Sequence, residues 1–242
     1  MERAYTRTYR FKKIILAQSL AFLIVVLAAG SLIFYAQGYS INFKNFKIIK
    51  NGLMVLNCID KPDKIEVSGK EIEAKSTIVK TLQRGEYYIV ASKKGCENWE
   101  RNAKIEPEIL SEFSEIVFFV SKAQISSMTQ DEINWMNSTP DSTLAESPKG
   151  KLSSNGYEIW LNERLVTRFS SKITQVKWYS NEKYITYLSD KEIRIIDRDG
   201  LNDTLLVTLD EAVNVKYLFR YQGKVIYFRD NDKYYKAKVR CD

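Results

Sequence analysis

The stretch DRDGLND gathers the carboxylates that are the most suggestive of chemistry in this sequence. Asp197, Asp199 and Asp203 lie within it, and Asn202 precedes the last of them. Carboxylate and amide oxygens are the ligands of calcium loops, which have glycine at the sixth position and glutamate at the twelfth. Here Gly200 is the fourth residue and no glutamate stands at the twelfth. We favour a hairpin turn, in which Asp and Gly are common, and keep a calcium loop as the alternative.

One segment matches a serine-nucleophile motif. Ser180-Asn181-Glu182-Lys183 has the S-x-x-K pattern, but serine acyl enzymes place this motif at a helix start, with S-D-N and K-T-G companions that are absent here. The chain has no histidine, which excludes Ser-His-Asp and Cys-His catalysis and histidine metal sites. No Walker A or G-x-G-x-x-G sequence is present. We therefore predict a non-enzymatic protein with no catalytic residue, cofactor or metal.

Two smaller features have simpler interpretations than catalysis. Glu106 and Glu108 flank Pro107 and fit a solvated turn better than an acid/base pair. Asn137 and Asn202 each begin an N-x-S/T sequon, which is used only where exported proteins are glycosylated.

The tryptophans are the remaining candidates for ligand contact. Such rings can stack on sugars, but they more commonly form the core of β-sheet proteins. We favour the core for all four, and Trp135, in a polar segment, is the one whose exposure would indicate ligand contact. The four residues are Trp99, Trp135, Trp160 and Trp178.

The three cysteines, Cys58, Cys96 and Cys241, are far apart and form no C-x-x-C pair. Zinc binding and thioredoxin-like chemistry are therefore not expected. A Cys58–Cys96 disulfide is one interpretation in an oxidising compartment. Buried, reduced thiols are the favoured one.

An uncharged apolar run extends from Ile14 to Tyr35. Its 22 residues would span about 33 Å as a helix, enough to cross the hydrocarbon core of a bilayer. Residues 1–13 hold five basic side chains and one acid, so the positive-inside rule predicts a cytoplasmic N-terminus and exported C-terminal domains. A cleaved signal peptide is the alternative, but the apolar run continues past its Ala28-Ala29-Gly30 site. We favour an uncleaved anchor over residues 14–36, followed by a tether over 37–50.

The net charge of +7 is concentrated near the N-terminus. Residues 1–13 contribute +4, so the remainder carries +3 (7 − 4) without a basic cluster. Nucleic-acid binding, which needs a basic stripe or patch, is therefore not expected.

A period of two begins near residue 51 and continues to residue 120. The expected strands are LMVLNCI, two short strands around Ser68-Gly69, three more in the segment punctuated by Gly85 and Gly95, and SEIVFFV. Both Gly85 and Gly95 are expected at positive φ. Alternation places Tyr87, Ile89 and Ala91 on the core face. The pattern predicts a small β-sandwich or half-barrel of about 70 residues.

Part of this segment resembles the PEGA domain family. The series Gly85-x-Tyr87-x-Ile89-x-Ala91-x-Lys93-x-Gly95, with Trp99 after it, is similar to the family's G-x-Y-x-V-x-V-x-K-x-G-Y pattern. Upstream, Pro62, Ile65-x-Val67-Ser68-Gly69 and the Thr77, Ile78 and Leu82 positions are similar to two other segments of the family. The Gly-Ala of its naming motif is absent, and Cys96 stands where the pattern has Tyr. The resemblance implies an extracytoplasmic scaffold without catalytic residues.

Residues 121–155 are rich in Ser, Thr and Asn and fit a linker or a degenerate repeat. From residue 156 to 242 we expect nine strands at intervals of about ten residues. VKWYSNEKYITYLSD from Val176 repeats as VKYLFRYQGKVIYFRD from Val215, 39 residues later. Such a period is that of a four-stranded propeller blade.

The repeat resembles the blades of WD-like and Tol-system-like propellers, which often read V-x-W-S-P-D-G followed by a strand ending in D-x-D-G. Here Val176-x-Trp178 begins the match and Asp197-x-Asp199-Gly200 ends it, with Asn181-Glu182 in place of Pro-Asp-Gly. Two to three blades do not close a ring, so we expect their faces to be covered by the sandwich, by each other or by a second copy. A twisted open sheet is the simpler alternative.

Together these features predict a mainly β protein with an N-terminal transmembrane helix, a PEGA-like sandwich and two to three propeller-like blades. The expected function is binding or scaffolding in the cell envelope, as a single-pass membrane protein whose partner is an envelope protein or polysaccharide. The alternatives are an extracytoplasmic hydrolase with a carboxylate-only site and an accessory subunit of a membrane complex.

Overall fold

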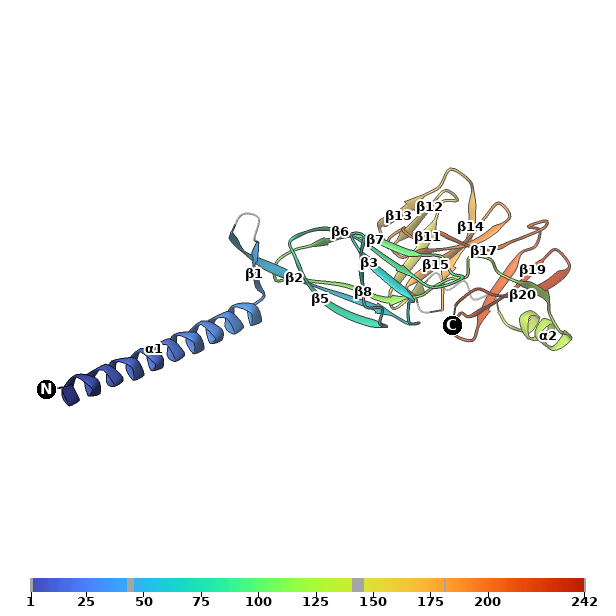
Figure 1. Ribbon diagram of the computed structural model, residues 1–242. Coiled ribbons are helices and arrows are strands. Elements are labelled where there is room, and N and C mark those ends of the chain that lie inside the picture. Colours follow the sequence, from blue (N-terminus) through green and yellow to red (C-terminus); the bar gives the residue numbers. More distant parts are fainter. Residues whose placement is uncertain (1, 43–45, 141–145, 181, 242) are drawn as a thin grey trace. The chain divides into compact units, whose positions relative to one another are not determined.

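The computed structural model describes residues 2–42, 46–140, 146–180 and 182–241, and it confirms a mainly β protein that begins with one long helix (Figure 1). The chain divides into two compact units. One comprises Met1–Val55, Val79–Glu86 and Lys104–Glu112, and the other comprises the remaining segments, Leu56–Ile78, Tyr87–Ala103 and Phe113–Asp242.

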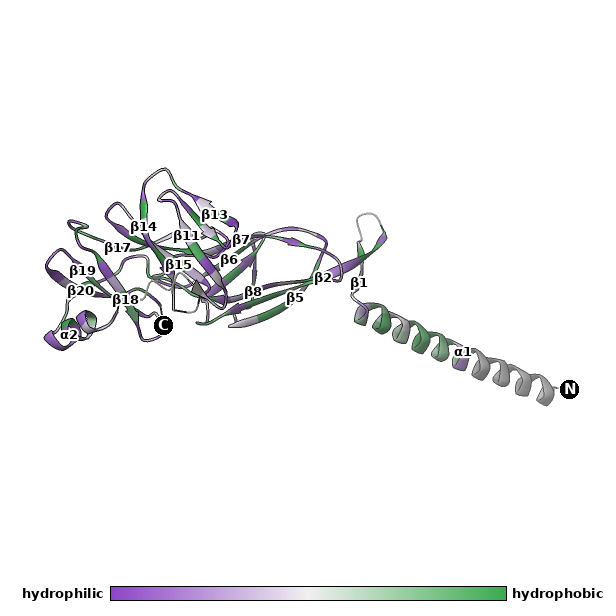
Figure 2. Ribbon diagram, turned by 180° about the vertical axis from the view of Figure 1, so that it is seen from behind, coloured by the Kyte–Doolittle hydropathy of each residue, from purple (hydrophilic) through white to green (hydrophobic). Residues whose placement is uncertain are grey.

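Helix α1, Glu2–Ala36, carries the apolar run. Its part from Ala17 to Ala36 is long and apolar enough to cross a membrane (Figure 2), and none of that part is buried inside the protein. A core helix of a water-soluble domain would be buried, so this exposure favours a membrane span or a signal sequence over a core helix. The basic side chains of residues 3–13 lie outside the side chains that the structure describes.

The segment expected to be a tether forms a hairpin. Strand β1, Tyr39–Asn42, pairs antiparallel with the start of β2, Lys47–Cys58. β-Branched residues on both sides of the turn favour extended backbone, which explains the pairing that the tether prediction missed.

The strands from β1 to β8 form two four-stranded sheets. One has the order β1-β2-β5, with β8 also paired to β2, and the other has the order β4-β3-β6-β7. Ile65 pairs with Ala91 and Val67 with Ile89, and all four side chains are buried, as the alternation predicts. Tyr87 is half-buried. The strands not yet bounded are β3 Lys64–Val67, β4 Lys70–Ile72, β5 Thr77–Gln83, β6 Gly85–Ser92, β7 Trp99–Ile105 and β8 Leu110–Ile116.

Two details of this region differ from prediction. Gly95 has φ +78°, as expected, but Gly85 lies inside β6 and is not among the positive-φ residues, so its prediction was wrong. The strand expected over 114–120 ends at Ile116. Val117 and Phe119 instead join a core cluster formed mainly by the C-terminal strands, which draws the chain out of the sheet.

The C-terminal part consists of three further four-stranded antiparallel sheets. The first two follow chain order, and the third has the order β18-β19-β20-β9. The nine strands expected after residue 156 are all present, as β12 to β20. Their bounds, with those of the three strands before them, are β9 Ile125–Ser127, β10 Glu146–Ser147, β11 Gly150–Ser154, β12 Glu158–Leu161, β13 Arg164–Arg168, β14 Ile173–Trp178, β15 Tyr184–Ser189, β16 Glu192–Asp197, β17 Thr204–Thr208, β18 Lys216–Arg220, β19 Val225–Asp230 and β20 Lys233–Lys238.

The three sheets are stacked through shared apolar clusters. Leu161, Ile185 and Tyr187 belong to the cluster between the first and second sheets, and Leu188 and Phe228 belong to the one between the second and third. Each sheet thus covers the face of its neighbour.

The two halves of the sequence repeat are in contact. Val176 on β14 and Val215 just before β18 occupy equivalent places in successive sheets. The Tyr217 hydroxyl donates a hydrogen bond to the carbonyl of Gln175 at 2.8 Å, and the Gln175 amide donates to the carbonyl of Val215 at 2.7 Å. The first strands of the two sheets therefore lie side by side.

Residues 121–155, interpreted as a linker or a degenerate repeat, supply β9, α2, β10 and β11. Helix α2, Gln130–Ser138, begins with a capping box in which Thr129 and Glu132 bond each other's backbone N–H groups. Its Met136 is fully buried and packs in one cluster with Leu218 and Tyr227. The helix therefore covers the outer face of the third sheet.

Gly223→Ala is expected to destabilise the protein by about 1–3 kcal/mol more than Gly69→Ala. Both glycines have positive φ, +86° and +75°, so each alanine adds a backbone strain of about 1–2 kcal/mol. A Cβ at Gly223 would overlap the buried Tyr179 hydroxyl, whereas a Cβ at Gly69 meets nothing within 4 Å. Urea unfolding of both variants measures the difference, and equal losses would contradict the steric argument.

Candidate functional site

The DRDGLND stretch forms a hairpin turn between β16 and β17. Gly200 has φ +86°, and its N–H donates to the Asp197 carbonyl at 2.9 Å. The Asp197 N–H donates to the Leu201 carbonyl, also at 2.9 Å, which closes the turn. The local hydrogen bonds and positive φ are those that favour Asp and Gly in such turns.

The carboxylates of this turn bind cationic and polar side chains of the protein. Arg101 on β7 donates to Asp197 at 2.6 Å and also forms an ion pair with Asp199. Asp203 accepts from Tyr187 at 2.7 Å and from Arg194 at 3.1 Å. Oxygens held in this way are directed to protein donors. Among the described residues, no group of three or more Cys, Asp or Glu is arranged to hold a metal ion.

Asp197 is the most deeply buried member of the turn. Its Oδ2 atom accepts from Arg101, from Asn202 at 2.9 Å and from the Trp99 indole at 3.2 Å. Its Oδ1 atom is buried and has no hydrogen-bond partner among the described residues. Loss of solvation raises the pKa of Asp197 to about 6, although Asn202 and Arg101 favour the charged form.

A polar groove of about 410 Å³ adjoins this turn. It is formed by the segment that leads into β7 and by the start of β17. The Asn202 side chain joins the two by accepting a hydrogen bond from the Glu100 N–H at 2.9 Å. The lining residues are Cys96, Glu97, Asn98, Glu100, Asn202, Asp203 and Thr204. Amide and carboxylate side chains of this kind suit hydroxyl or amine groups of a ligand.

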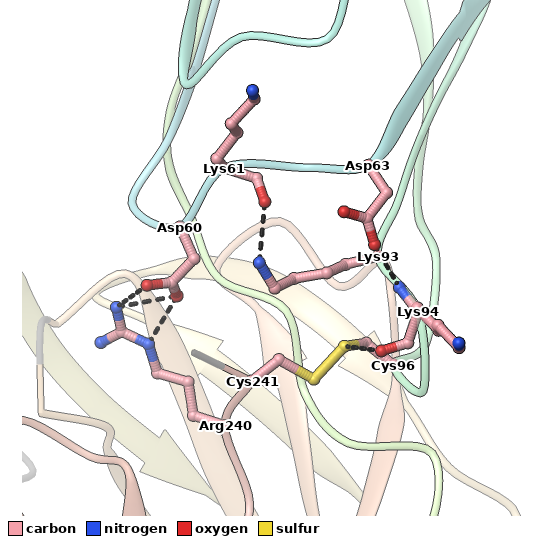
Figure 3. The surroundings of a disulfide bond; sticks show 8 residues. All are labelled: Asp60, Lys61, Asp63, Lys93, Lys94, Cys96, Arg240 and Cys241. Carbon is pink, nitrogen blue, oxygen red and sulfur yellow. Dashed lines mark hydrogen bonds and ion pairs between the residues drawn. A yellow bond between two sulfur atoms is a disulfide. The ribbon is translucent and has the colours of Figure 1, made fainter.

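A disulfide lies at one side of the groove, because Cys96 is one of its lining residues. It joins Cys96 to Cys241 (Figure 3), and the two Cα atoms are 6.5 Å apart, within the usual range for such bonds. Cys58 is buried and reduced. The Cys58–Cys96 pairing was therefore wrong, and the prediction of a buried thiol holds for Cys58 alone.

An ion pair accompanies the disulfide. Arg240 precedes Cys241 and binds both carboxylate oxygens of Asp60, at 2.9 and 3.0 Å (Figure 3). Both side chains are largely buried. The last residues of the described chain are thus fixed covalently and electrostatically to the segment that follows β2. We call these four residues, Asp60, Cys96, Arg240 and Cys241, the C-terminal clasp.

The four tryptophans do not gather at one site, although Trp99 contacts the turn through Asp197. Trp99 and Trp178 are core residues, and Trp135 and Trp160 are half-buried. The Trp135 ring lies against the Arg220 guanidinium, 4.4 Å from its centroid, so packing accounts for its partial burial.

The remaining motifs lie at the surface. Ser180 is exposed in the turn between β14 and β15, and Asn181 of the same motif lies outside the described residues. Asn137 is exposed on α2, whereas the Asn202 side chain is engaged in the turn. Lys50 pairs with Glu108 beside Pro107, and Lys104 pairs with Glu106.

Sequence reasoning missed Arg101, Asp60 and Arg240, which hold the turn and the C-terminal clasp. Each is a single charged residue in a chain with 28% charged residues, and its partner lies at least 96 residues away. No local pattern could have indicated these pairs.

Comparison of the chain with protein-family models, with curated proteins and with solved structures finds no match.

Proposed function

We propose that this chain is a single-pass, membrane-anchored protein of the cell envelope. Its β-sheet domains face the extracytoplasmic side, where they bind or space other components without catalysing a reaction. Two regions of the chain support this proposal. The helix that could span a membrane stands next to a basic N-terminal segment, and a disulfide stands in the part that would be exported.

The Cys96–Cys241 disulfide carries the argument. Disulfides form and persist in oxidising compartments and are rare in the cytosol. This one joins residues 145 positions apart, so it depends on the completed fold and not on a local coincidence of cysteines. It favours export of the C-terminal domains over their retention in the cytosol.

The architecture also favours a binding or spacing role. The PEGA-like pattern covers the strands up to residue 120, and three stacked four-stranded sheets follow it. We interpret these sheets as propeller-like blades, since the first strands of two of them lie side by side at the sequence repeat. Because α2 covers the outer face of the third sheet, the array of sheets does not need to close into a ring. The face of the first sheet is the place where a second copy of the chain would pack.

The groove of about 410 Å³ is the place where we expect a small ligand or a polysaccharide segment to bind. Its polar lining suits a hydroxyl-rich or amine-bearing group better than an apolar one. An envelope polysaccharide or a polar segment of an envelope protein has this chemistry.

Protease treatment of intact cells tests the proposal. If it is correct, the β-sheet domains are digested or released while the N-terminal segment is protected. Non-reducing electrophoresis of the released fragment should show a mobility shift on reduction. A C-terminal part that is resistant in intact cells but digested after lysis would contradict the proposed topology.

A carboxylate-only hydrolase is the second candidate, because Glu97, Glu100 and Asp203 line one groove. Two of these carboxylates already bind tyrosine hydroxyl groups, Glu100 with Tyr88 and Asp203 with Tyr187. Hydrolysis of envelope glycans by the parent and its loss in Glu97→Gln/Glu100→Gln would favour this candidate over the binding protein.

A further inference from the structure

The hairpin formed by β1 and the start of β2 is tied directly to the end of α1. Only Gln37 and Gly38 separate the helix from Tyr39. Gly38 has φ +78°, and its N–H donates to the Tyr35 carbonyl at 3.0 Å, so the chain turns immediately after the helix. The Phe34 and Tyr39 rings are stacked with centroids 5.3 Å apart. The hairpin is therefore held against the helix end and is not a loose extension of it.

One face of this hairpin is largely apolar, with Lys50 at its helix end, where this side chain pairs with Glu108 and lies 5.2 Å from the centroid of the Tyr39 ring. Ile41 pairs with Ile48 across the two strands, which places their side chains on the same face. Their exposed fractions are 44% and 64%, and that of Phe46 beside the turn is 82%. Ser40 and Lys47 alternate with these isoleucines and belong to the opposite face, together with the half-buried Ile49. In water, three large apolar side chains would remain exposed on one short hairpin.

The length of the helix places this face close to a bilayer. The 20 residues from Ala17 to Ala36 span about 30 Å, the thickness of the hydrocarbon core. Tyr39 follows three residues later and so lies within about 10 Å of the hydrocarbon edge. The headgroup layer on each side is about 5–8 Å thick. The hairpin cannot extend far from this layer, because the Phe34–Tyr39 stack and the Gly38 turn hold its first strand at the helix end.

We infer that β1 and the start of β2 form a membrane-interface hairpin, in which Ile41, Phe46 and Ile48 contact the acyl chains of the outer leaflet. Aromatic and aliphatic side chains with neighbouring lysines are typical of this layer. The inference rests on the membrane anchoring proposed above. It adds a second attachment to the bilayer, which limits the tilt and rotation of the chain on its helix.

Spin labels on the full-length protein in phosphatidylcholine–phosphatidylglycerol nanodiscs test this inference. Ile48→Cys and Lys47→Cys, each in a Cys58→Ala background, place labels at adjacent positions on opposite faces. We expect the ratio of oxygen accessibility to water-soluble nickel-chelate accessibility to be several-fold higher at position 48 than at 47. A label at Phe46→Cys should give an accessibility ratio similar to that at position 48. This agreement would exclude a local distortion at one labelled site as the cause.

Two outcomes would overturn the inference. Equal nickel-chelate access at 47 and 48 would mean that the apolar face is in water. A label at 48 that neither reagent reaches would mean that protein, such as a second copy of this chain, covers the face. A separate measurement tests the proposed function: reaction of Lys47→Cys with a membrane-impermeant thiol reagent on intact cells. Failure of that reaction would contradict the extracytoplasmic location and leave the depth result standing.

Discussion

The double substitution Cys96→Ser/Cys241→Ser is expected to lower the free energy of unfolding by about 5 kcal/mol. The disulfide closes a loop of 145 residues, and the chain-entropy model gives about this value for a loop of that length. Measured effects of native disulfides are usually about 2–5 kcal/mol, so the prediction lies at the upper end. The loss would be a large fraction of the stability of a typical domain.

Urea unfolding of the full-length protein in detergent, followed by tryptophan fluorescence, measures this change. The parent in reducing agent should unfold at the same lower midpoint as the double variant. The double variant itself should be insensitive to reductant, which separates the disulfide from any effect on Cys58. A parent protein whose midpoint does not change on reduction would contradict the prediction.

Arg101→Met is expected to destabilise the protein by about 3–5 kcal/mol, because it leaves the Asp197 carboxylate buried without its cationic partner. The side chains of Arg101 and Asp197 are only 10% and 6% exposed. Arg168→Met is the matched control, since Arg168 also pairs with a carboxylate, that of Glu158, but is itself 70% exposed. We expect this control to cost less than about 1 kcal/mol.

The pH dependence of the Arg101→Met variant provides a second measurement. The pKa of Asp197 is raised from 3.8 to about 6 in the fold, so the folded state binds a proton that the unfolded state releases. The contribution of this group to stability is therefore greatest below about pH 4 and is lost as the pH rises through about 6. Removing Arg101 raises the pKa further.

The loss of unfolding free energy in Arg101→Met, relative to the parent, should therefore be smaller at pH 5 than at pH 7.5. Asp197→Asn removes the titrating group, so the double variant Arg101→Met/Asp197→Asn should lack this pH dependence. Urea midpoints at the two pH values measure both effects. A deficit that is constant between pH 5 and pH 7.5 would show that loss of packing, and not the unpaired carboxylate, is the cause.

The strands could be predicted because each needs only local information. Ile65 and Val67 flank Glu66, and Tyr87 and Ile89 flank Tyr88. Such alternation indicates a buried face within a few residues. The 39-residue repeat likewise indicated two successive sheets before any contact between them was known. The end of β8 could not be predicted, because Val117 and Phe119 leave the sheet for a core to which distant strands contribute.

The candidate site was predicted only in part, for a related reason. Asp197, Asp199 and Asp203 were visible as a cluster, and their turn chemistry follows from Asp and Gly. What they bind was not visible, since Arg101 lies 96 residues from Asp197. The disulfide could not be predicted either, because three cysteines allow three pairings and only the fold brings Cys96 to Cys241.

The position of β9 has a consequence for the order in which the sheets can fold. Ser127 on β9 pairs with Tyr235 on β20, 108 residues later in the chain (235 − 127). Contacts between such distant positions slow folding, because the intervening chain must be ordered first. If the β-sheet domains are exported as proposed, a nascent chain would expose the edge of β9 until β20 had left the translocation channel. Truncated products that lack β20 should therefore remain open to quality-control proteases.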